Sequence, residues 1–132
     1  MSYIDNQDGT VTDTSTGLMW QKETTPVKYT WQNALQYCES LEFAGHSGWR
    51  LPNVRELQSI VDYGRFSPSS DPIFGAEFGW YWSSSTSVND PNDAWVVSFV
   101  DGLVAFDLKD YDDFVRAVRG PTGEEATHAE ES

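Results

Sequence analysis

The stretch that most constrains the fold is GWRLPNVREL, residues 48–57. Within it, Asn53 can cap a helix, and Glu56 stands three positions later as the acid of a capping box. The apolar residues that follow recur at helical spacing, so we predict a helix over residues 53–63. We interpret Arg50, just before this helix, as a structural ion-pairing residue.

A second amphipathic segment lies upstream of this helix, at residues 30–41. Thr30 is a suitable N-cap, and the apolar residues of the segment fall on one helical face. These residues are Trp31, Ala34, Leu35, Cys38 and Leu41. We interpret Cys38 as a small buried hydrophobic residue and not as a reactive thiol.

Strand and turn signals occupy both ends of the chain. Near the N-terminus, Asp8 and Gly9 supply hairpin-turn chemistry between short β-prone runs within residues 3–20. In the second half, residues 94–100 are apolar on both faces, which is typical of a central strand. Its predicted companions are a strand beginning at residues 80–82, a strand at 103–106 after the Asp101-Gly102 turn, and a last strand at 115–119. Two helices ahead of a mostly antiparallel sheet indicate an α+β domain.

The length of 132 residues suits one domain, which we place at residues 1–119. Residues 64–79 are predicted to form a long irregular loop with its own apolar anchors, among them Phe74. Loops of this length inside a compact domain are usually functional or pinned by side chains. Residues 120–132 are rich in Gly, Pro, Ala and Glu, so we predict an acidic disordered tail or a linker there.

The charge of the chain limits its partners. It carries 21 acidic against 8 basic residues, a net charge of −13. Such a charge repels phosphate backbones and anionic surfaces, so we expect no nucleic-acid binding. It fits either plain solubility or a cationic or basic partner. No run reaches the ~18 apolar residues of a membrane span, and no signal-peptide pattern opens the chain, so we expect no membrane insertion.

Two acidic segments are candidate ligand sites. The first is made of Asn89, Asp90, Asn92 and Asp93, just before the central strand. The second holds four aspartates within residues 107–113, and we expect both segments to lie together at strand ends. Because carboxylate and amide oxygens are the ligands that calcium prefers, the segments suggest a calcium site. Its candidate ligands are Asp90, Asp93, Asp110 and Asp112. Ordinary turn chemistry and a solvated loop are the alternative interpretations.

Aromatic residues make up 14% of the chain, and three of them open one strand. Strand alternation predicts that Trp80 and Trp82 share one face while Tyr81 points the other way. We interpret Trp82 and Trp95 as core residues. Trp80 and Tyr81, together with the amides and acids of residues 89–93, are our ligand-contact candidates.

Catalytic chemistry finds little support in the sequence. Cys38 is the single cysteine of the chain, and His46 and His128 stand apart, so we expect neither a catalytic pair nor a zinc site. The serine run at residues 83–85 follows no nucleophile-elbow pattern. We therefore expect a protein that is not an enzyme and has no cofactor other than the candidate calcium.

Several motifs follow one another along the chain: DNQDGTVTD (5–13) with TGLMW (16–20), GWRLP (48–52) with EL (56–57), YWSSS (81–85), and AWVVSF (94–99) with DG (101–102), closing in VRAVR (115–119). Taken in order, they resemble the Lcl C-terminal domain family, named for a collagen-like Legionella adhesin. No motif is specific alone, but their order and spacing together are. The resemblance runs over about residues 3–119.

The resemblance implies a C-type-lectin-like fold, with two helices, a sheet that joins the chain ends and a long-loop region that carries binding. It also implies an extracellular or cell-surface recognition domain for a glycan or a protein. A structural module that uses the same face for self-association, as a homo-oligomer, or for domain packing is the alternative. Relatives often place at Ala117 a cysteine that could pair with one in the first helix, and here Cys38 has no such partner. The acidic composition also argues against a sulfated-glycan ligand.

Overall fold

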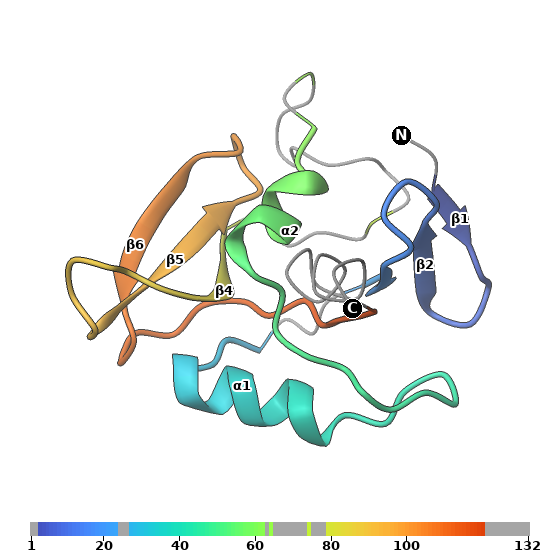
Figure 1. Ribbon diagram of the computed structural model, residues 1–132, viewed down its shortest axis with the longest axis horizontal. Coiled ribbons are helices and arrows are strands. Elements are labelled where there is room, and N and C mark those ends of the chain that lie inside the picture. The colour runs from blue at the N-terminus through green and yellow to red at the C-terminus, as the bar shows by residue number, and fades with distance from the viewer. Residues whose placement is uncertain (1–2, 24–26, 63, 65–73, 75–78, 121–132) are drawn as a thin grey trace, which may run out of the picture.

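The computed structural model describes residues 3–23, 27–62, 64, 74 and 79–120. In these residues it has two helices and two antiparallel sheets, so the predicted α+β class is confirmed. Figure 1 shows the three-stranded sheet on one side of the molecule and the N-terminal strands on the other. Neither helix of this part of the chain has the length and apolar character of a membrane span.

The two ends of the chain meet in a four-stranded antiparallel sheet. Its strands are β1 (Tyr3–Asp5), β2 (Thr10–Asp13), β3 (Met19–Gln21) and β7 (Val118–Arg119), in the order β1-β2-β3-β7. The predicted hairpin joins β1 to β2, and Gly9 takes the positive φ of 92° in its turn. The sheet therefore joins the first and last strands, as the family resemblance implied.

The second sheet has three strands and lies between the two helices in the fold. Its strands are β4 (Trp80–Thr86), β5 (Asp93–Ser98) and β6 (Val104–Leu108), in the order β4-β5-β6. The central place of β5 confirms the prediction from its two apolar faces. The expectation of a single sheet is wrong, because the strands divide between two sheets.

The predicted last strand, residues 115–119, is mostly a connecting segment. Only its end pairs as β7, whereas the residues before it bond one at a time to partners in different elements. The N–H of Phe114 donates to the carbonyl of Trp80 at 2.9 Å, and the N–H of Gln21 donates to the carbonyl of Ala117 at 3.1 Å. The segment thus links the two sheets, which explains why it is buried without forming a regular strand.

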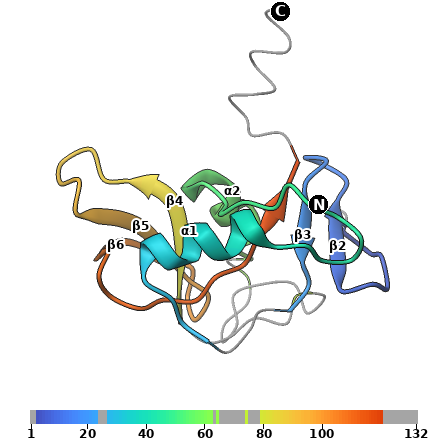
Figure 2. The same cartoon turned by 90° about the horizontal axis from the view of Figure 1, so that it is seen from below.

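Both predicted helices are present, and both begin at the predicted caps. Helix α1 (Trp31–Ser40) follows Thr30, whose side chain accepts a hydrogen bond from the N–H of Asn33. Helix α2 (Val54–Ser59) starts with the capping box, in which Asn53 and Glu56 bond reciprocally at 2.9 Å. Figure 2 shows α1 across the front of the molecule with α2 behind it.

Helix α2 ends earlier than the predicted boundary at residue 63. The N–H groups of Ile60 and Val61 donate to the carbonyls of Leu57 and Gln58, three residues back. Bonds of this type tighten the last turn and end the regular helix.

The three-stranded sheet carries a core on each face. On one face, Tyr81 and Val97 pack with Leu57 of α2 and with Trp20 of the other sheet. On the other face, aromatic and aliphatic residues pack against α1 and the chain before α2; they are Ala34, Cys38, Trp49, Leu51, Trp82, Ala94, Val96, Val115 and Ala117. The predicted alternation of Tyr81 and Trp82 is confirmed.

Cys38 is fully buried on the inner face of α1, as predicted. Burial raises the pKa of its thiol to about 12. Because the thiolate is the nucleophilic form, Cys38 is unreactive near neutral pH.

Two predicted segments are described only in part. In the 64–79 loop, Phe74 is 2% exposed and its ring lies edge-on to Tyr3 at 5.1 Å, so its role as an apolar anchor is confirmed. Most of the remaining loop, and the predicted tail after Gly120, lie outside the described residues.

Candidate functional site

The two predicted acidic segments meet at one end of the three-stranded sheet, as expected. The backbone N–H of Lys109 donates to the carbonyl of Asn92 at 2.9 Å, and Asp93 pairs with Leu108 across the strands. Four of the predicted site residues are exposed here and two are half-buried; the exposed ones are Asn89, Asn92, Asp110 and Asp112, and the half-buried ones are Asp90 and Asp93.

These acidic residues do not gather into a metal site. Asp90 turns back on its own loop, where its Oδ1 accepts a hydrogen bond from the N–H of Asn92 at 2.9 Å. Among the described residues, no three Asp, Glu, His or Cys side chains are placed to hold an ion. The candidate calcium ligands Asp90, Asp93, Asp110 and Asp112 are therefore not assembled, and turn chemistry accounts for Asp90.

The predicted aromatic contacts lie in or against the core. Tyr81 is 0% exposed, and its ring packs edge-on to Phe99 at 4.9 Å. The expectation that Tyr81 contacts a ligand is therefore wrong, because its face of the strand is covered. Trp80 is half-buried and packs against the same cluster as Trp82.

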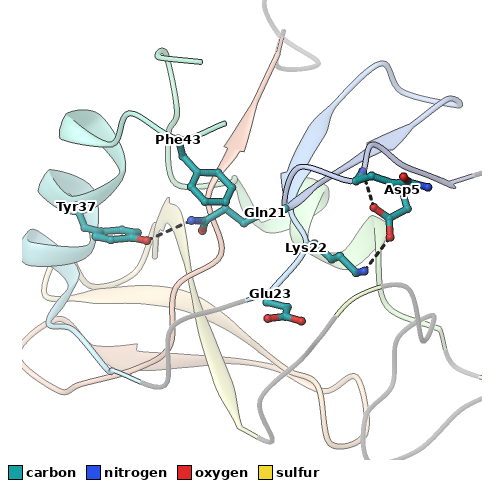
Figure 3. Close-up of a pocket in the computed structure, with 8 residues that line it drawn as sticks. Asp5, Gln21, Lys22, Glu23, Tyr37 and Phe43 are labelled. Carbon is teal, nitrogen blue, oxygen red and sulfur yellow. Dashed lines mark hydrogen bonds and ion pairs between the residues drawn. The ribbon is translucent and has the colours of Figure 1, made fainter. Parts of the chain in front are cut away.

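A cleft of about 750 Å³ opens elsewhere, beside the β1–β2 hairpin (Figure 3). Its walls come from the hairpin, the end of β3, α1 and the loop after α1. The lining residues are Asp5, Gln7, Gly9, Gln21, Lys22, Glu23, Tyr37 and Phe43. This size, and the mixture of two aromatic rings with a few polar groups, are typical of a site for a small ligand.

Gln21 is held in place on two sides. Its Oε1 accepts a hydrogen bond from the N–H of Ala117 at 2.8 Å, and its Nε2 donates to the hydroxyl of Tyr37 at 3.2 Å. Beneath it, the buried guanidinium of Arg116 donates to the backbone carbonyls of both Gln21 and Lys22. The end of β3 is therefore fixed before any ligand arrives, which lowers the entropic cost of binding.

An ion pair stands across the cleft from the aromatic rings. Lys22 Nζ lies 2.8 Å from Asp5 Oδ2, and the two side chains are 34% and 33% exposed. The hydrogen bond from Lys22 lowers the pKa of Asp5, and the same bond raises the pKa of Lys22. Both groups are therefore ionised near neutral pH, and Lys22 keeps further N–H donors for a ligand.

Backbone strain concentrates around this cleft. In the described chain, the two non-glycine residues with positive φ are Gln7 at 60° and Ala44 at 55°. Gln7 lines the cleft, and Ala44 belongs to the turn that presents Phe43, closed by hydrogen bonds of 3.0 and 2.9 Å between Phe43 and His46. Strain of this kind clusters at functional sites, so it supports the cleft as the site.

Sequence reasoning missed the cleft because its residues come from four separated parts of the chain. Each local pattern also has a purely structural interpretation. Asp8-Gly9 marks a hairpin turn, and Tyr37 packs at the edge of the apolar face of α1. One usable signal is Gly9 itself, because a Cβ there would lie 2.7 Å from the ring of Phe43. That contact joins the hairpin to the loop after α1, and only the folded chain reveals it.

Comparison with known proteins identifies one family over most of the chain. The family described as the Lcl C-terminal domain matches residues 9–119. No curated protein matches the sequence.

Proposed function

Since the chain belongs to the Lcl C-terminal domain family, which is associated with adhesins, we propose that it is a non-enzymatic recognition domain that binds an uncharged glycan in the cleft. The C-type-lectin-like fold and a location at the cell surface or outside the cell are parts of the same proposal. The observation that carries it is the fixed Asp5–Lys22 pair facing two aromatic side chains in one concave site.

A sugar ring matches this arrangement group by group. Adjacent hydroxyls can donate to the carboxylate of Asp5 and accept from the ammonium of Lys22 without separating the ion pair. The second N–H of Gln21 Nε2 and the hydroxyl proton of Tyr37 offer further donors. The rings of Tyr37 and Phe43 give apolar surface for the C–H groups of the sugar.

The charges of the cleft favour an uncharged ligand. Lys22 is already neutralised by Asp5, and the exposed Glu23 adds a further negative charge. A sulfated or carboxylated sugar would meet this negative charge and the net charge of −13 of the whole chain. We therefore expect neutral sugars to bind and heparin-like polymers to be rejected.

A glycan array, followed by calorimetry with the best neutral oligosaccharide, tests the proposal. Lys22→Met removes the ammonium and should weaken binding about tenfold or more, as expected when a charged hydrogen-bonding group is lost. Lys28→Met is the control, because Lys28 is a more exposed lysine that does not line the cleft. Binding should survive EDTA, since the described residues of the cleft include no group of three side chains placed to hold a metal ion.

Several outcomes would count against the proposal. If both lysine variants bind the glycan equally well, the cleft is not the binding site. Binding of sulfated polymers alone would contradict the expected preference for uncharged sugars. Release of shortened glycan during incubation would show an enzyme. A stable oligomer in solution that is broken by Lys22→Met would favour the assembly module instead.

A further inference from the structure

The three-stranded sheet exposes an aromatic surface whose residues are far in the sequence from those of the cleft. We define the sheet-end patch as Trp95, Phe106 and Leu108. Trp95 and Phe106 are direct cross-strand partners, with ring centroids 3.9 Å apart. Phe106 is 44% exposed and Leu108 is 43% exposed. Trp95 is half-buried, so its interpretation as a core residue holds only for part of its ring.

The patch is the outer continuation of a buried face. Two residues along β5, Val97 shares the face of Trp95 and packs in the core with Leu57 of α2. Phe106 and Leu108 are two positions apart on β6 and therefore share this face. Strand β6 is an edge strand in the order β4-β5-β6. Apolar surface therefore extends from the core to the edge of the sheet, and no described helix or strand covers Phe106 or Leu108.

Acidic residues form a rim beside this apolar surface at the sheet end. Asp93 is the direct cross-strand partner of Leu108, and the exposed Asp110 and Asp112 follow Leu108 closely in the chain. Asp107 points to the other face of the sheet and hydrogen-bonds the buried Asp113, so these two acids do not belong to the rim.

The two segments that meet here, residues 86–93 and 107–113, hold one lysine. That lysine, Lys109, is already engaged, with Nζ 4.0 Å from the centre of the Trp31 ring and 3.0 Å from the Thr86 hydroxyl. In the described part of the chain no ion pair engages Asp93, Asp110 or Asp112, so this rim can attract the cations of a partner.

We propose that the sheet-end patch docks a basic protein segment that carries arginine or lysine between apolar side chains. Its apolar side chains would cover Phe106 and Leu108, and its cations would meet Asp110 and Asp112 or lie on the exposed ring of Phe106. Aromatic anchors inside a charged rim are the usual composition of a protein-binding surface. The patch is separate from the glycan cleft, and the proposal does not depend on glycan binding.

The charge distribution argues against the other occupants. A second copy of the chain in a two-fold contact would bring the same acidic rims together, which is repulsive. Anionic polymers would be repelled in the same way. A neutral glycan could stack on Phe106 but would gain no ion pairing from the aspartate rim, whereas a basic segment would gain both.

Binding of a synthetic peptide of alternating arginine and leucine, followed by fluorescence anisotropy, tests the apolar part. Phe106→Ser should weaken binding of this peptide about tenfold or more, as for an interface anchor. Leu103→Ser is the matched control, because Leu103 is 59% exposed on the same hairpin but lies at its opposite end. A peptide with glutamate in place of arginine should not bind.

A pair of double variants tests the charged part. Asp110→Asn with Asp112→Asn should weaken binding and flatten its dependence on salt. Glu39→Gln with Glu42→Gln removes the same charge from exposed positions outside the patch and should leave affinity unchanged. Melting temperatures close to wild type for all variants establish that folding is not the cause.

The proposal is overturned if Phe106→Ser binds the peptide like wild type, or if both double variants weaken binding equally, which would mean non-specific charge attraction. Dissociation of an oligomer by Phe106→Ser would assign the patch to a second copy. Glycan binding should be unchanged in Phe106→Ser, so failure of the cleft proposal and failure of this one are distinguishable.

Discussion

Ala44 adopts a left-handed backbone conformation that ordinarily suits glycine, with φ at 55°. The left-handed conformation of an alanine lowers the free energy of unfolding by about 1–2 kcal/mol. A glycine avoids this strain, but its greater freedom in the unfolded chain lowers the free energy of unfolding by about 0.5–1 kcal/mol. We expect Ala44→Gly to raise the free energy of unfolding by about 0.5–1 kcal/mol in urea titrations. Ala105→Gly, on an ordinary strand, should lower it, and a similar loss at Ala44 would show that its conformation is unstrained.

Asp113 is a buried carboxyl beside another carboxyl. It is 6% exposed, and its Oδ2 has no hydrogen-bond partner among the described residues. Burial and a hydrogen bond with the side chain of Asp107 raise the pKa of Asp113 to about 8, although Lys28 acts in the opposite direction. The pair therefore holds a shared proton at neutral pH.

This shared proton predicts how stability changes with pH. Because the pKa of Asp113 is higher in the folded chain, folding binds a proton between about pH 4 and pH 8, and stability falls as pH rises through that range. Asp113→Asn should reduce this fall and stabilise the protein at pH 8 by about 1–3 kcal/mol, the usual cost of an unsatisfied buried polar group. Glu42→Gln, at an exposed position that does not act on Asp113, should leave the slope unchanged in the same urea titrations.

At the scale of elements, Glu56 connects the start of α2 to the end of the chain. Its carboxylate accepts two hydrogen bonds from Arg50, at 2.7 and 2.8 Å, and one from the N–H of Asn53 at 2.9 Å. Arg50 in turn pairs through its backbone with Val118 of β7. The ion pair confirms the structural role that the sequence indicated for Arg50.

Removal of this carboxylate should therefore weaken more than one element. Glu56→Ala leaves a half-buried guanidinium and an unsatisfied cap N–H, so we expect a loss of about 2–4 kcal/mol in the free energy of unfolding. Glu42→Ala, at an exposed position, is the control and should change stability by less than about 0.5 kcal/mol. A loss at Glu56 no larger than at Glu42 would mean that the cap is dispensable.

The elements that the sequence predicts well are those whose signals are local. The Thr30 cap and the box of Asn53 and Glu56 lie within four residues of the helices they start, and both are present. The segment before β7 was not predicted correctly, because Phe114 and Ala117 take their hydrogen bonds from elements far away in the sequence. The cleft has the same origin: Asp5, Lys22 and Tyr37 line one site only when the hairpin meets the loop after α1 and Gln21 of β3 bonds to Tyr37.

At the scale of the whole molecule, negative charge is poorly compensated. The net charge is −13, and the ion pairs seen among the described residues are Lys22–Asp5 and Arg50–Glu56. Most carboxylates therefore repel one another across the surface, and this repulsion destabilises the compact state. Salt costs little attraction by comparison, because the partly exposed Lys22–Asp5 pair contributes little and the mostly buried Arg50–Glu56 pair is screened much less.

We therefore expect sodium chloride to raise the melting temperature by a few degrees between low salt and about 0.15 M, where the screening length falls to about 8 Å. Calorimetry at matched pH measures this change, and an equal concentration of an uncharged osmolyte is the control. Calcium and magnesium chloride at equal concentration should act alike if screening is the whole cause. A larger rise with calcium than with magnesium, abolished by Asp90→Asn, would show a specific calcium site and restore that interpretation. A fall in melting temperature with added salt would show that attractive ion pairs outweigh the repulsion.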